Sequence, residues 1–254
     1  MPKRQRLDLA LVERDLTPSR EKARALILAA DVLVNGNVET RASAMVAVEA
    51  EVSIVAAARF VGRGGDKLEH ALTAFGIDCA GQVVMDVGAS TGGFTDCMLQ
   101  RGAERVYAID VGYGQMASRL RDDSRVVVME RTNIRDLASL PARPVIATID
   151  TSFISLTTVL PAAIALLAPK ADIVALVKPQ FEAGRDEVKR GGVVRDPLVH
   201  AAVIGRVAWW CLNHGLRVRG VAMSPLLGPA GNREFFLWLR VDGNGTADFA
   251  DDAD

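Results

Sequence analysis

The chain has 254 residues, of which 50% are hydrophobic, and its formal net charge at pH 7 is −1. This length permits one large domain, or one medium domain with a small module, and the near-neutral balance excludes binding to nucleic acid through an overall basic field. The three cysteines are odd in number, lie far apart and form no C-x-x-C pair: Cys79, Cys97 and Cys211. This usage argues against a disulfide framework, and we expect reduced thiols in a cytoplasmic protein.

No targeting, membrane-spanning or metal-binding segment is expected. The basic N-terminus, residues 1–6, is not followed by an apolar segment with a small-residue cleavage site, so a secretory signal is not predicted. The longest apolar run, Val159–Ala168, is too short to span a bilayer. The histidines are scattered and cannot form a metal cluster from sequence neighbours: His70, His200 and His214.

The first 60 residues predict a small α+β module. Apolar residues at helical spacing indicate a helix over Arg6–Glu13, and Ser19 is a good N-cap for a second helix over Arg20–Ala30. The pair Asn35-Gly36, between β-forming residues, is a strong hairpin signal within Val32–Val38. Further short strands are expected around Val46, Val48, Val52 and Ile54.

Basic residues are concentrated in this module and just after it. The second predicted helix carries Arg20 and Arg24 on one face, with Lys22 beside them. A charged helix face is usually only solvated, so the charges alone leave RNA binding and an ordinary surface equally open. The candidates for contact with RNA are Arg4, Arg6, Arg20, Lys22, Arg24 and Arg63.

The rest of the chain has the pattern of one α/β domain. A glycine-rich joint over 61–67 is expected to link the module to a domain over 68–241, and the acidic stretch 242–254 is expected to be a disordered tail. The alternation of elements predicts a mostly parallel sheet covered on both faces, whose last two strands are antiparallel. Strands are predicted over 82–87, 105–109, 126–129, 145–149, 173–177, 218–223 and 235–241, and helices over 67–75, 94–101, 114–121, 155–168 and 197–214.

A glycine-rich turn follows the first of these strands and favours a nucleotide-containing cofactor. The strand runs into the turn through Asp86 and Gly88, and Asp110 ends the next strand. A glycine loop after one strand and an acid after the next is the arrangement that binds nucleotides in doubly wound sheets. The spacing is not G-x-G-x-x-G, and the acid two residues before the first glycine favours S-adenosylmethionine (SAM). A tight βα turn without a ligand is the alternative.

A SAM site is expected around this turn. Asp110 would bind the ribose hydroxyls, and Asn133 or Asp136 would contact the adenine. Asp86 would order the loop and would not touch the reactive end of the ligand. The turn itself would lie under the cofactor, through Gly88, Ala89, Ser90, Gly92, Gly93 and Phe94.

Four charged residues are expected at the carboxyl edge of the sheet. Asp150 and Lys178 each end a predicted strand, and Lys67 opens the helix after the glycine joint. Ligands in open α/β sheets bind outside the carboxyl ends of the strands, and Glu234 lies at that edge if the last strand runs antiparallel. Each residue alone could be an ordinary strand-end charge, but four at one edge predict a catalytic site.

The N-terminal module resembles the S4 RNA-binding fold. The matching segments are Arg6-Leu7-Asp8, Ser19-Arg20-Glu21-Lys22-Ala23 and Val32-Leu33-Val34-Asn35-Gly36. The resemblance covers roughly the first 60 residues, and several enzyme and ribosomal families carry this motif. It implies that the two basic helices and the adjoining turn bind structured RNA.

The four charged residues resemble the Lys-Asp-Lys-Glu tetrad of the FtsJ-type ribose 2′-O-methyltransferases. With the S4-like module, the resemblance narrows to the TlyA family, the hemolysin A-like ribosomal RNA methyltransferases. The fold implied is α/β, a Rossmann-like SAM-dependent methyltransferase sheet with a small N-terminal α+β S4 domain. Thr91 stands where FtsJ-type enzymes often have proline, and Asp66 where many relatives have an apolar or aromatic residue. The motifs that carry the resemblance are Arg63–Leu68, Asp86–Thr95, Asp150–Leu156, Val177–Glu182 and Gly231–Glu234.

The resemblance implies SAM-dependent 2′-O-methylation of cytidine in ribosomal RNA, in the small subunit, the large subunit or both. A ribose hydroxyl is a poor nucleophile while it is protonated, so a base must accept its proton as the methyl group is attacked. We assign Lys178 as this base and Lys67 as its electrostatic and orienting partner. Asp150 and Glu234 would hold the two amines by hydrogen bonds. This mechanism requires no metal.

Three rival functions fit the sequence less well. A non-enzymatic S4 RNA-binding protein would not need the glycine loop or Lys178. A membrane-active hemolysin would need a membrane-length apolar span or a strongly amphipathic basic helix. A base methyltransferase would usually carry a catalytic cysteine or an Asn/Asp-Pro-Pro-Tyr/Phe motif, and the segment Asp150-Thr151-Ser152-Phe153 lacks the prolines.

Overall fold

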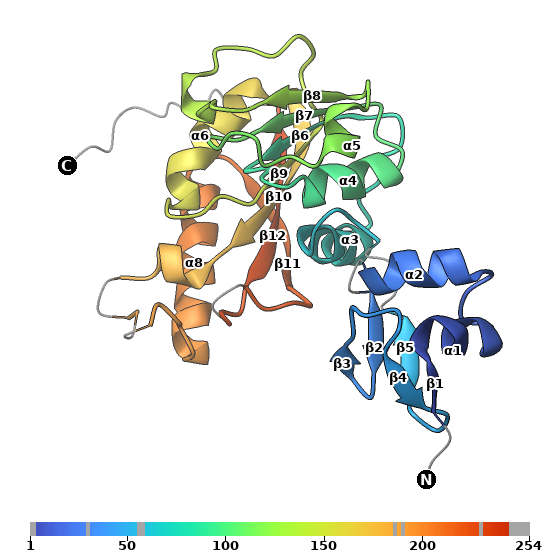
Figure 1. The fold of residues 1–254 in the computed structure, drawn as a ribbon. Helices are drawn as coiled ribbons and strands as arrows, with labels where there is room; N and C mark the ends of the chain where they lie inside the picture. Colours follow the sequence, from blue (N-terminus) through green and yellow to red (C-terminus); the bar gives the residue numbers. More distant parts are fainter. Residues whose placement is uncertain are drawn as a thin grey trace. The chain divides into compact units, whose positions relative to one another are not determined.

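The chain forms two compact units, Met1–Arg59 and Phe60–Asp254, in a computed structural model that describes residues 4–28, 31–54, 59–184, 187–188, 191–228 and 231–243 (Figure 1). The segment expected as a linker, 61–67, instead belongs to the second unit. Phe60 is buried in the core of that unit, and helix α3 begins at Gly64. Gly65 permits this packing, since a Cβ atom there would lie 2.2 Å from Cγ of Phe60.

The first unit combines two helices and two small antiparallel sheets around one hydrophobic core. The helices are α1 (Leu7–Glu13) and α2 (Arg20–Leu28). The strands are β1 (Arg4–Arg6), paired with β4 (Met45–Ala47), and β2 (Val32–Val34), paired with both β3 (Asn37–Val38) and β5 (Val52–Ile54). The core holds Leu7, Leu11, Ile27 and Val46 from α1, α2 and β4.

Two local signals of the first unit are confirmed. Strands β2 and β3 form the predicted hairpin, and Asn35 and Gly36 at its turn both have positive φ, the conformation that an Asn-Gly turn favours. The Ser19 hydroxyl oxygen accepts a hydrogen bond from the backbone N–H of Lys22 at 3.2 Å. Ser19 therefore caps the helix that the sequence placed after it.

The second unit is built on a seven-stranded sheet with the order β11-β12-β10-β9-β6-β7-β8. Strands β6 to β10 pair in parallel, and β12 pairs antiparallel with both β10 and β11. This confirms the predicted parallel sheet with an antiparallel final pair. The strands are β6 (Val83–Val87), β7 (Arg105–Ile109), β8 (Val126–Met129), β9 (Ile146–Ile149), β10 (Lys170–Val177), β11 (Arg217–Met223) and β12 (Phe235–Asp242).

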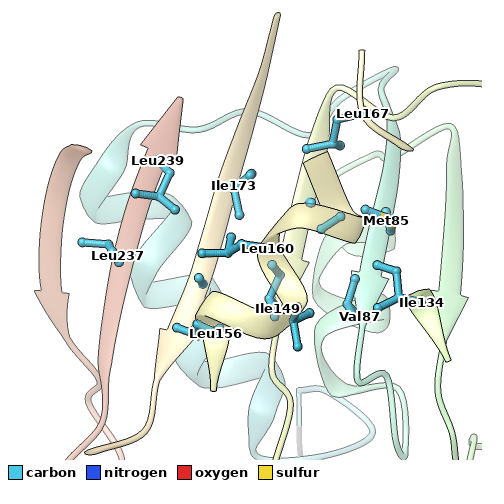
Figure 2. Close-up of a cluster of buried hydrophobic side chains, with 14 of the residues drawn as sticks. Met85, Val87, Ile134, Ile149, Leu156, Leu160, Leu167, Ile173, Leu237 and Leu239 are labelled. Carbon is cyan, nitrogen blue, oxygen red and sulfur yellow. The ribbon is translucent and has the colours of Figure 1, made fainter. Parts of the chain in front are cut away.

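Helices cover both faces of this sheet (Figure 1). Side chains alternate along β10, so that Ile173 and Ala175 face α6 and α8 while Val174 and Leu176 face α3 and α4. Figure 2 shows the first of these two cores, where Leu156 and Leu160 of α6 lie against the sheet. The helices are α3 (Gly64–Phe75), α4 (Gly93–Gln100), α5 (Ser118–Arg121), η1 (Ile134–Asp136), α6 (Leu156–Leu166), α7 (Pro179–Glu182) and α8 (Pro197–Asn213).

Some predicted boundaries differ from the structure. Arg6 belongs to β1, which was not predicted, so the first helix begins one residue later than expected. Val48 lies in a turn after β4. The helix predicted over 114–121 is reduced to α5, because Gly114 has a φ of 70° and Ala117 is extended. The end of the second predicted helix, residues 29–30, lies outside the described residues.

The predicted acidic tail overlaps the last strand. Asp242 ends β12 and pairs in register with Lys170 at the start of β10. The tail residues 244–254 lie outside the described residues. Within the described ranges, no helix is long and apolar enough to cross a membrane.

Candidate active site

A cavity of about 500 Å³ lies at the carboxyl ends of β6, β7 and β9. Its walls include Gly88 from the β6–α4 turn, Asp110 from the end of β7 and Asp150 from the end of β9. This is the edge at which open α/β sheets bind ligands, and the volume falls within the roughly 300–1,000 Å³ of small-molecule sites. The cavity is therefore the candidate cofactor site.

The β6–α4 turn is shaped by the strands on either side of it. Gly88 has a φ of 85°, and a Cβ atom there would lie 2.5 Å from the carbonyl oxygen of Asp150. A glycine is required because the chain leaving β9 passes this close to the turn. The Asp110 carboxylate fastens the turn to β7, since it accepts hydrogen bonds from the backbone N–H groups of Ser90 at 2.7 Å and Gly112 at 2.6 Å.

Four of the predicted cofactor residues line the cavity: Gly88, Ser90, Asp110 and Asn133. Asn133 also caps η1 by accepting a hydrogen bond from the backbone N–H of Arg135. Sequence reasoning missed other wall residues, among them Gln115, Thr132 and Phe153. Gln115 and Thr132 stand on turns whose course depends on the packed sheet, whereas Phe153 lies in the motif Asp150–Leu156, to which no cofactor contact was assigned.

The other predicted cofactor residues are not among those that line the cavity, and packing explains several of them. A Cβ atom on Gly92 would lie 2.2 Å from Cδ1 of Leu120, and one on Gly93 would lie 3.0 Å from the backbone nitrogen of Gly65. These two glycines therefore permit close packing of α4 against neighbouring elements. Phe94 is buried against Phe236, with ring centroids 6.1 Å apart. The remaining ones are Ala89, which is buried, Asp136, which is exposed on η1, and Asp86.

Asp86 is a fully buried carboxyl beneath the turn. It accepts hydrogen bonds from the hydroxyl groups of Thr95 on α4, at 2.7 Å, and Thr148 on β9, at 3.0 Å. Burial raises its pKa from the usual 3.8 to about 7, although the two threonine hydrogen bonds oppose the rise. Asp86 thus joins β6, α4 and β9 through its two hydrogen bonds.

The four predicted catalytic residues form two lysine–carboxylate pairs. Lys67 Nζ lies 2.5 Å from Glu234 Oε2, and both side chains are almost completely buried. Lys178 Nζ lies 2.6 Å from Asp150 Oδ1 and donates a hydrogen bond to Ser152 Oγ at 2.9 Å. This second pair is more open, with side-chain exposures of 12% for Lys178 and 23% for Asp150.

Strand pairing places the two pairs at the same edge. Val177 of β10 is in register with Phe235 of β12, so Lys178 and Glu234 are the next residues at that end of the two strands. The carboxylates also keep unused acceptors within the described part of the chain. Glu234 Oε1 is buried without a hydrogen bond, and Asp150 Oδ1 is buried with Lys178 Nζ as its ion-pair partner.

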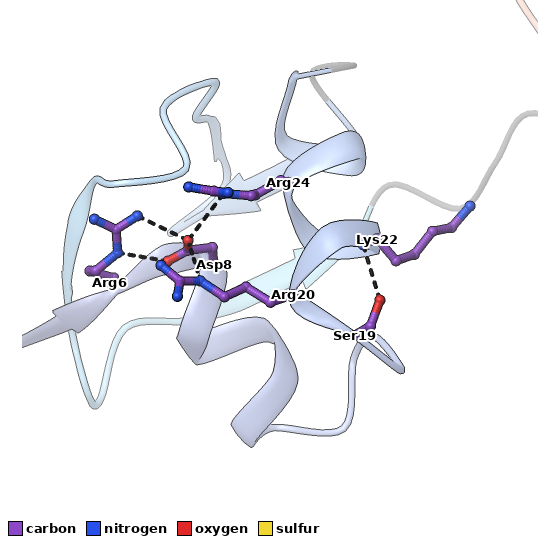
Figure 3. A network of polar contacts seen from close by, with 6 residues as sticks. All are labelled: Arg6, Asp8, Ser19, Arg20, Lys22 and Arg24. Atoms are coloured by element: carbon purple, nitrogen blue, oxygen red, sulfur yellow. Dashed lines mark hydrogen bonds and ion pairs between the residues drawn. The ribbon is translucent and has the colours of Figure 1, made fainter.

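A cluster of arginines surrounds one buried carboxylate in the first unit (Figure 3). Asp8 is fully buried, and Arg6, Arg20 and Arg24 lie 2.9, 2.8 and 3.6 Å from its oxygens. The hydrogen bond from Arg6, together with that from Arg20, lowers the pKa of Asp8 to about 2. The three arginine side chains remain 35–56% exposed, whereas Lys22 points away from the cluster.

The other predicted RNA-contacting residues and the cysteines lie outside these clusters. Arg4 and Arg63 are exposed, on β1 and just before α3. The three cysteines are buried, and burial raises the pKa of Cys79 to about 11 and that of Cys211 to about 12. Among the described residues, no three His, Cys, Asp or Glu side chains are grouped as metal ligands would be.

Two family models match the chain. The model of the FtsJ-like methyltransferases matches residues 60–241, and the model of the S4 domain matches residues 5–52. The chain belongs to the FtsJ-like methyltransferase family. The match extends from the buried Phe60 to the last strand of the sheet, and the S4 match covers the arginine cluster.

Individual relatives agree with this family. The chain is 47% identical over 95% of its length to the 16S/23S rRNA (cytidine-2′-O)-methyltransferase TlyA of Mycobacterium tuberculosis, of which it covers 91%. A solved structure from Streptococcus thermophilus that carries a hemolysin name is 39% identical, with a TM-score of 0.73 over 95% of this chain and 89% of that one. A structure from Listeria monocytogenes named as a SAM-dependent methyltransferase is 15% identical and shares the fold, with a TM-score of 0.53 over 71% of this chain and 99% of that one.

The raised pKa of Asp86 predicts a pH-dependent contribution to the stability of this FtsJ-like methyltransferase. Between about pH 4 and pH 7 the folded carboxyl stays protonated while the unfolded one ionises, so the folded state binds more protons. The free energy of unfolding contributed by this group therefore falls as the pH rises through that window. Asp86→Asn, which does not titrate, should gain stability relative to the wild type over the same range.

Denaturant titrations at several pH values measure this difference. The control is Asp78→Asn, which makes the same substitution in the exposed turn before β6. A difference between wild type and Asp86→Asn that stays constant from about pH 4 to pH 7 would contradict the raised pKa.

Proposed function

We propose that this methyltransferase uses SAM to methylate the ribose 2′-hydroxyl of a cytidine in ribosomal RNA. The observation that carries the proposal is the contact between Lys178 and Asp150. Asp150 lines the cofactor cavity and holds the Lys178 amine 2.6 Å away, which puts a candidate base beside the place where a methyl donor would bind. The relative from M. tuberculosis named for this reaction supports the choice of substrate.

The residues around the cavity fit SAM. Asp110 and Asn133 offer oxygen acceptors for ribose hydroxyls and an adenine amine, and the Gly88 backbone lets a ligand approach without a Cβ atom in the way. When bound, SAM would supply an electrophilic methyl group on its sulfonium. Gly88, Ser90, Asp110 and Asn133 would hold it.

The chain's own residues would move the proton. Lys178 Nζ accepts the proton of the 2′-hydroxyl once its amine is neutral, and Asp150 and Ser152 keep that amine in place. Lys67 is fixed by its buried ion pair with Glu234 at the same edge of the sheet, and it would help to orient the groups around the base. The remaining acceleration of methyl transfer would come from holding the 2′-hydroxyl and the base close together in the correct orientation.

The first unit would supply RNA affinity. Arg6, Arg20 and Arg24 present guanidinium groups that are bound to Asp8 on one side and open to solvent on the other. Guanidinium groups in such an array bind phosphate oxygens, and bound phosphates release counterions. We propose that this cluster contacts the backbone of ribosomal RNA.

Asp110 and Asp136 were both predicted to contact SAM, but their substitution should affect SAM affinity differently. Asp110→Ala should weaken SAM binding on the order of ten-fold or more, since a lost hydrogen bond to a charged group costs about 1.5–3 kcal/mol. The variant also frees the β6–α4 turn from β7. Asp136→Ala is the matched control, because Asp136 is exposed outside the cavity wall and should leave the affinity unchanged. Calorimetry measures both, and equal affinities in the two variants would refute the Asp110 contact.

Substitution of Lys178 tests the proposed base. Lys178→Ala should lower the single-turnover rate roughly 10²- to 10⁴-fold with little change in SAM affinity, because the amine acts on the RNA hydroxyl. Lys178→Arg should also fail, since a guanidinium keeps its proton. The control is Lys170→Ala, at the exposed opposite end of the same strand. Near-wild-type turnover by Lys178→Arg would refute the role of Lys178 as a base and would show that it acts only as a positioning charge.

The same variants test the substrate. Ribose methylation is mapped across ribosomal RNA from cells with the wild-type chain, with Lys178→Ala and without the gene. We expect a methylated cytidine that is present only with the wild-type chain. Identical maps in all three strains would overturn the proposed function.

The arginine cluster gives a separate prediction for RNA affinity. Arg20→Ala with Arg24→Ala should weaken RNA binding and reduce the slope of log K against log salt by about 1 for each phosphate that the variant no longer neutralises. The control is Arg41→Ala, which removes an exposed arginine that pairs with Glu39 outside the cluster. Filter binding at several salt concentrations measures the slope, and an unaltered slope in the double variant removes these arginines from the RNA-binding surface.

A further inference from the structure

Two turns meet beside Lys178, and more than one contact joins them. The first, here called the β9–α6 turn, comprises Asp150–Ser155, and the second is the single helical turn α7 that follows Lys178. Lys178 contacts Asp150 and Ser152 at the start of the β9–α6 turn. Further along, the centroids of the Phe153 and Phe181 rings lie 4.9 Å apart.

Glu182 makes the last of these contacts. Its Oε1 accepts a hydrogen bond from the backbone N–H of Leu156 at 2.7 Å, and its Oε2 accepts one from the Ser155 hydroxyl at 2.7 Å. Ser155 in turn caps α6 by accepting from the backbone N–H of Thr157. The carboxylate thus fixes the end of the β9–α6 turn at the N-terminus of a helix, where negative charge is favourable.

The β9–α6 turn has a conformation that needs such support. Phe153, at its centre, has a φ of 65°, in the left-handed region that non-glycine residues rarely adopt. The residue is 88% exposed, so its burial does not hold the backbone in place. Strained residues persist only where their surroundings over-determine them, and here the turn is held at one end by Lys178 and at the other by Glu182.

We infer that Glu182 is a positioning residue for the proposed base: it holds the β9–α6 turn in the conformation that keeps Asp150 and Ser152 on the Lys178 amine. The inference rests on the proposed function, in which Lys178 accepts the proton of the RNA hydroxyl. Glu182 itself touches neither the amine nor the cavity wall through the hydrogen bonds described, which go to Ser155 and Leu156. It acts through these two residues.

The test compares Glu182→Ala, Glu182→Gln and a control in the full-length protein. Glutamine can still accept from the Leu156 N–H, and its amide can donate to the Ser155 hydroxyl, so this variant should retain most of the wild-type rate. Glu182→Ala removes both hydrogen bonds and should lower the single-turnover rate on the order of ten- to a hundred-fold at saturating SAM and RNA, as expected for a misplaced base. The control is Glu187→Ala, which removes a carboxylate that binds the Gly184 N–H and Arg206 instead.

A second readout separates positioning from simple helix capping. Lysine amines are labelled with acetic anhydride at fixed pH, and the labelling of Lys178 is compared by mass spectrometry with that of the exposed Lys170. Glu182→Ala should increase the relative labelling of Lys178 several-fold, because the amine is no longer held by fixed partners, whereas Glu187→Ala should not. A role confined to capping α6 would lower the thermal midpoint and leave the labelling ratio unchanged, which would overturn the inference.

Ser155→Ala provides a milder variant if Glu182→Ala fails to fold, because Leu156 keeps its bond to the carboxylate. It should raise Lys178 labelling by a smaller factor, and an unchanged ratio in a folded Ser155→Ala would overturn the inference. The labelling needs no RNA. A raised ratio in a chain whose wild type methylates no ribosomal RNA would support the positioning role while the proposed function fails.

Discussion

The active-site edge depends on the antiparallel pairing of β12 with β10. At the carboxyl edge of a parallel sheet lie the residues that follow each parallel strand. An antiparallel strand begins at that edge, so the residues that precede it lie there as well. The register between Val177 and Phe235 therefore places Glu234 next to Lys178, although the two residues are far apart in sequence. Without this reversal, Glu234 would lie at the opposite edge of the sheet, away from Lys67.

The two lysine–carboxylate pairs differ in burial, and this difference fits two different roles. The Lys67–Glu234 pair is almost fully buried, so removing either partner would leave an uncompensated charge in the interior. Such a pair is a fixed feature of the fold. The Lys178–Asp150 pair is partly exposed, and Asp150 lines the cavity. The difference in burial favours Lys178 over Lys67 as the group that exchanges a proton.

Signals carried by neighbouring residues were enough to predict much of this fold. The alternating strands and helices predicted the sheet, Asn35-Gly36 predicted the hairpin, and the charges at strand ends predicted which residues meet at one edge. These patterns are local, or follow from the rule that parallel strands end together. The antiparallel arrangement of the last two strands was also predicted, and the structure confirms it.

Features that arise from contact between distant segments were not predictable. Gly92 looked like a ligand-contacting glycine, but the atom it makes room for belongs to Leu120. The joint predicted before the domain includes the beginning of α3, because Phe60 packs under Gly65. Glu182 stood inside a motif without an assigned role, since its partners lie 26 and 27 residues earlier in the chain.

The arginine cluster around Asp8 has a consequence for the affinity of the proposed contact with RNA. Three guanidinium groups and one carboxylate give a net charge of 3 − 1 = +2, and the low pKa of Asp8, about 2, keeps this charge constant over the physiological range. Free arginine side chains lose rotamer entropy when they bind, at a cost of about 0.5–1.5 kcal/mol each. In this cluster the contacts with Asp8 already restrict the arginine side chains in the folded protein. Asp8 lowers the net positive charge of the cluster by one, which would weaken its attraction to RNA phosphates, but it also holds the guanidinium donors in a preorganised array.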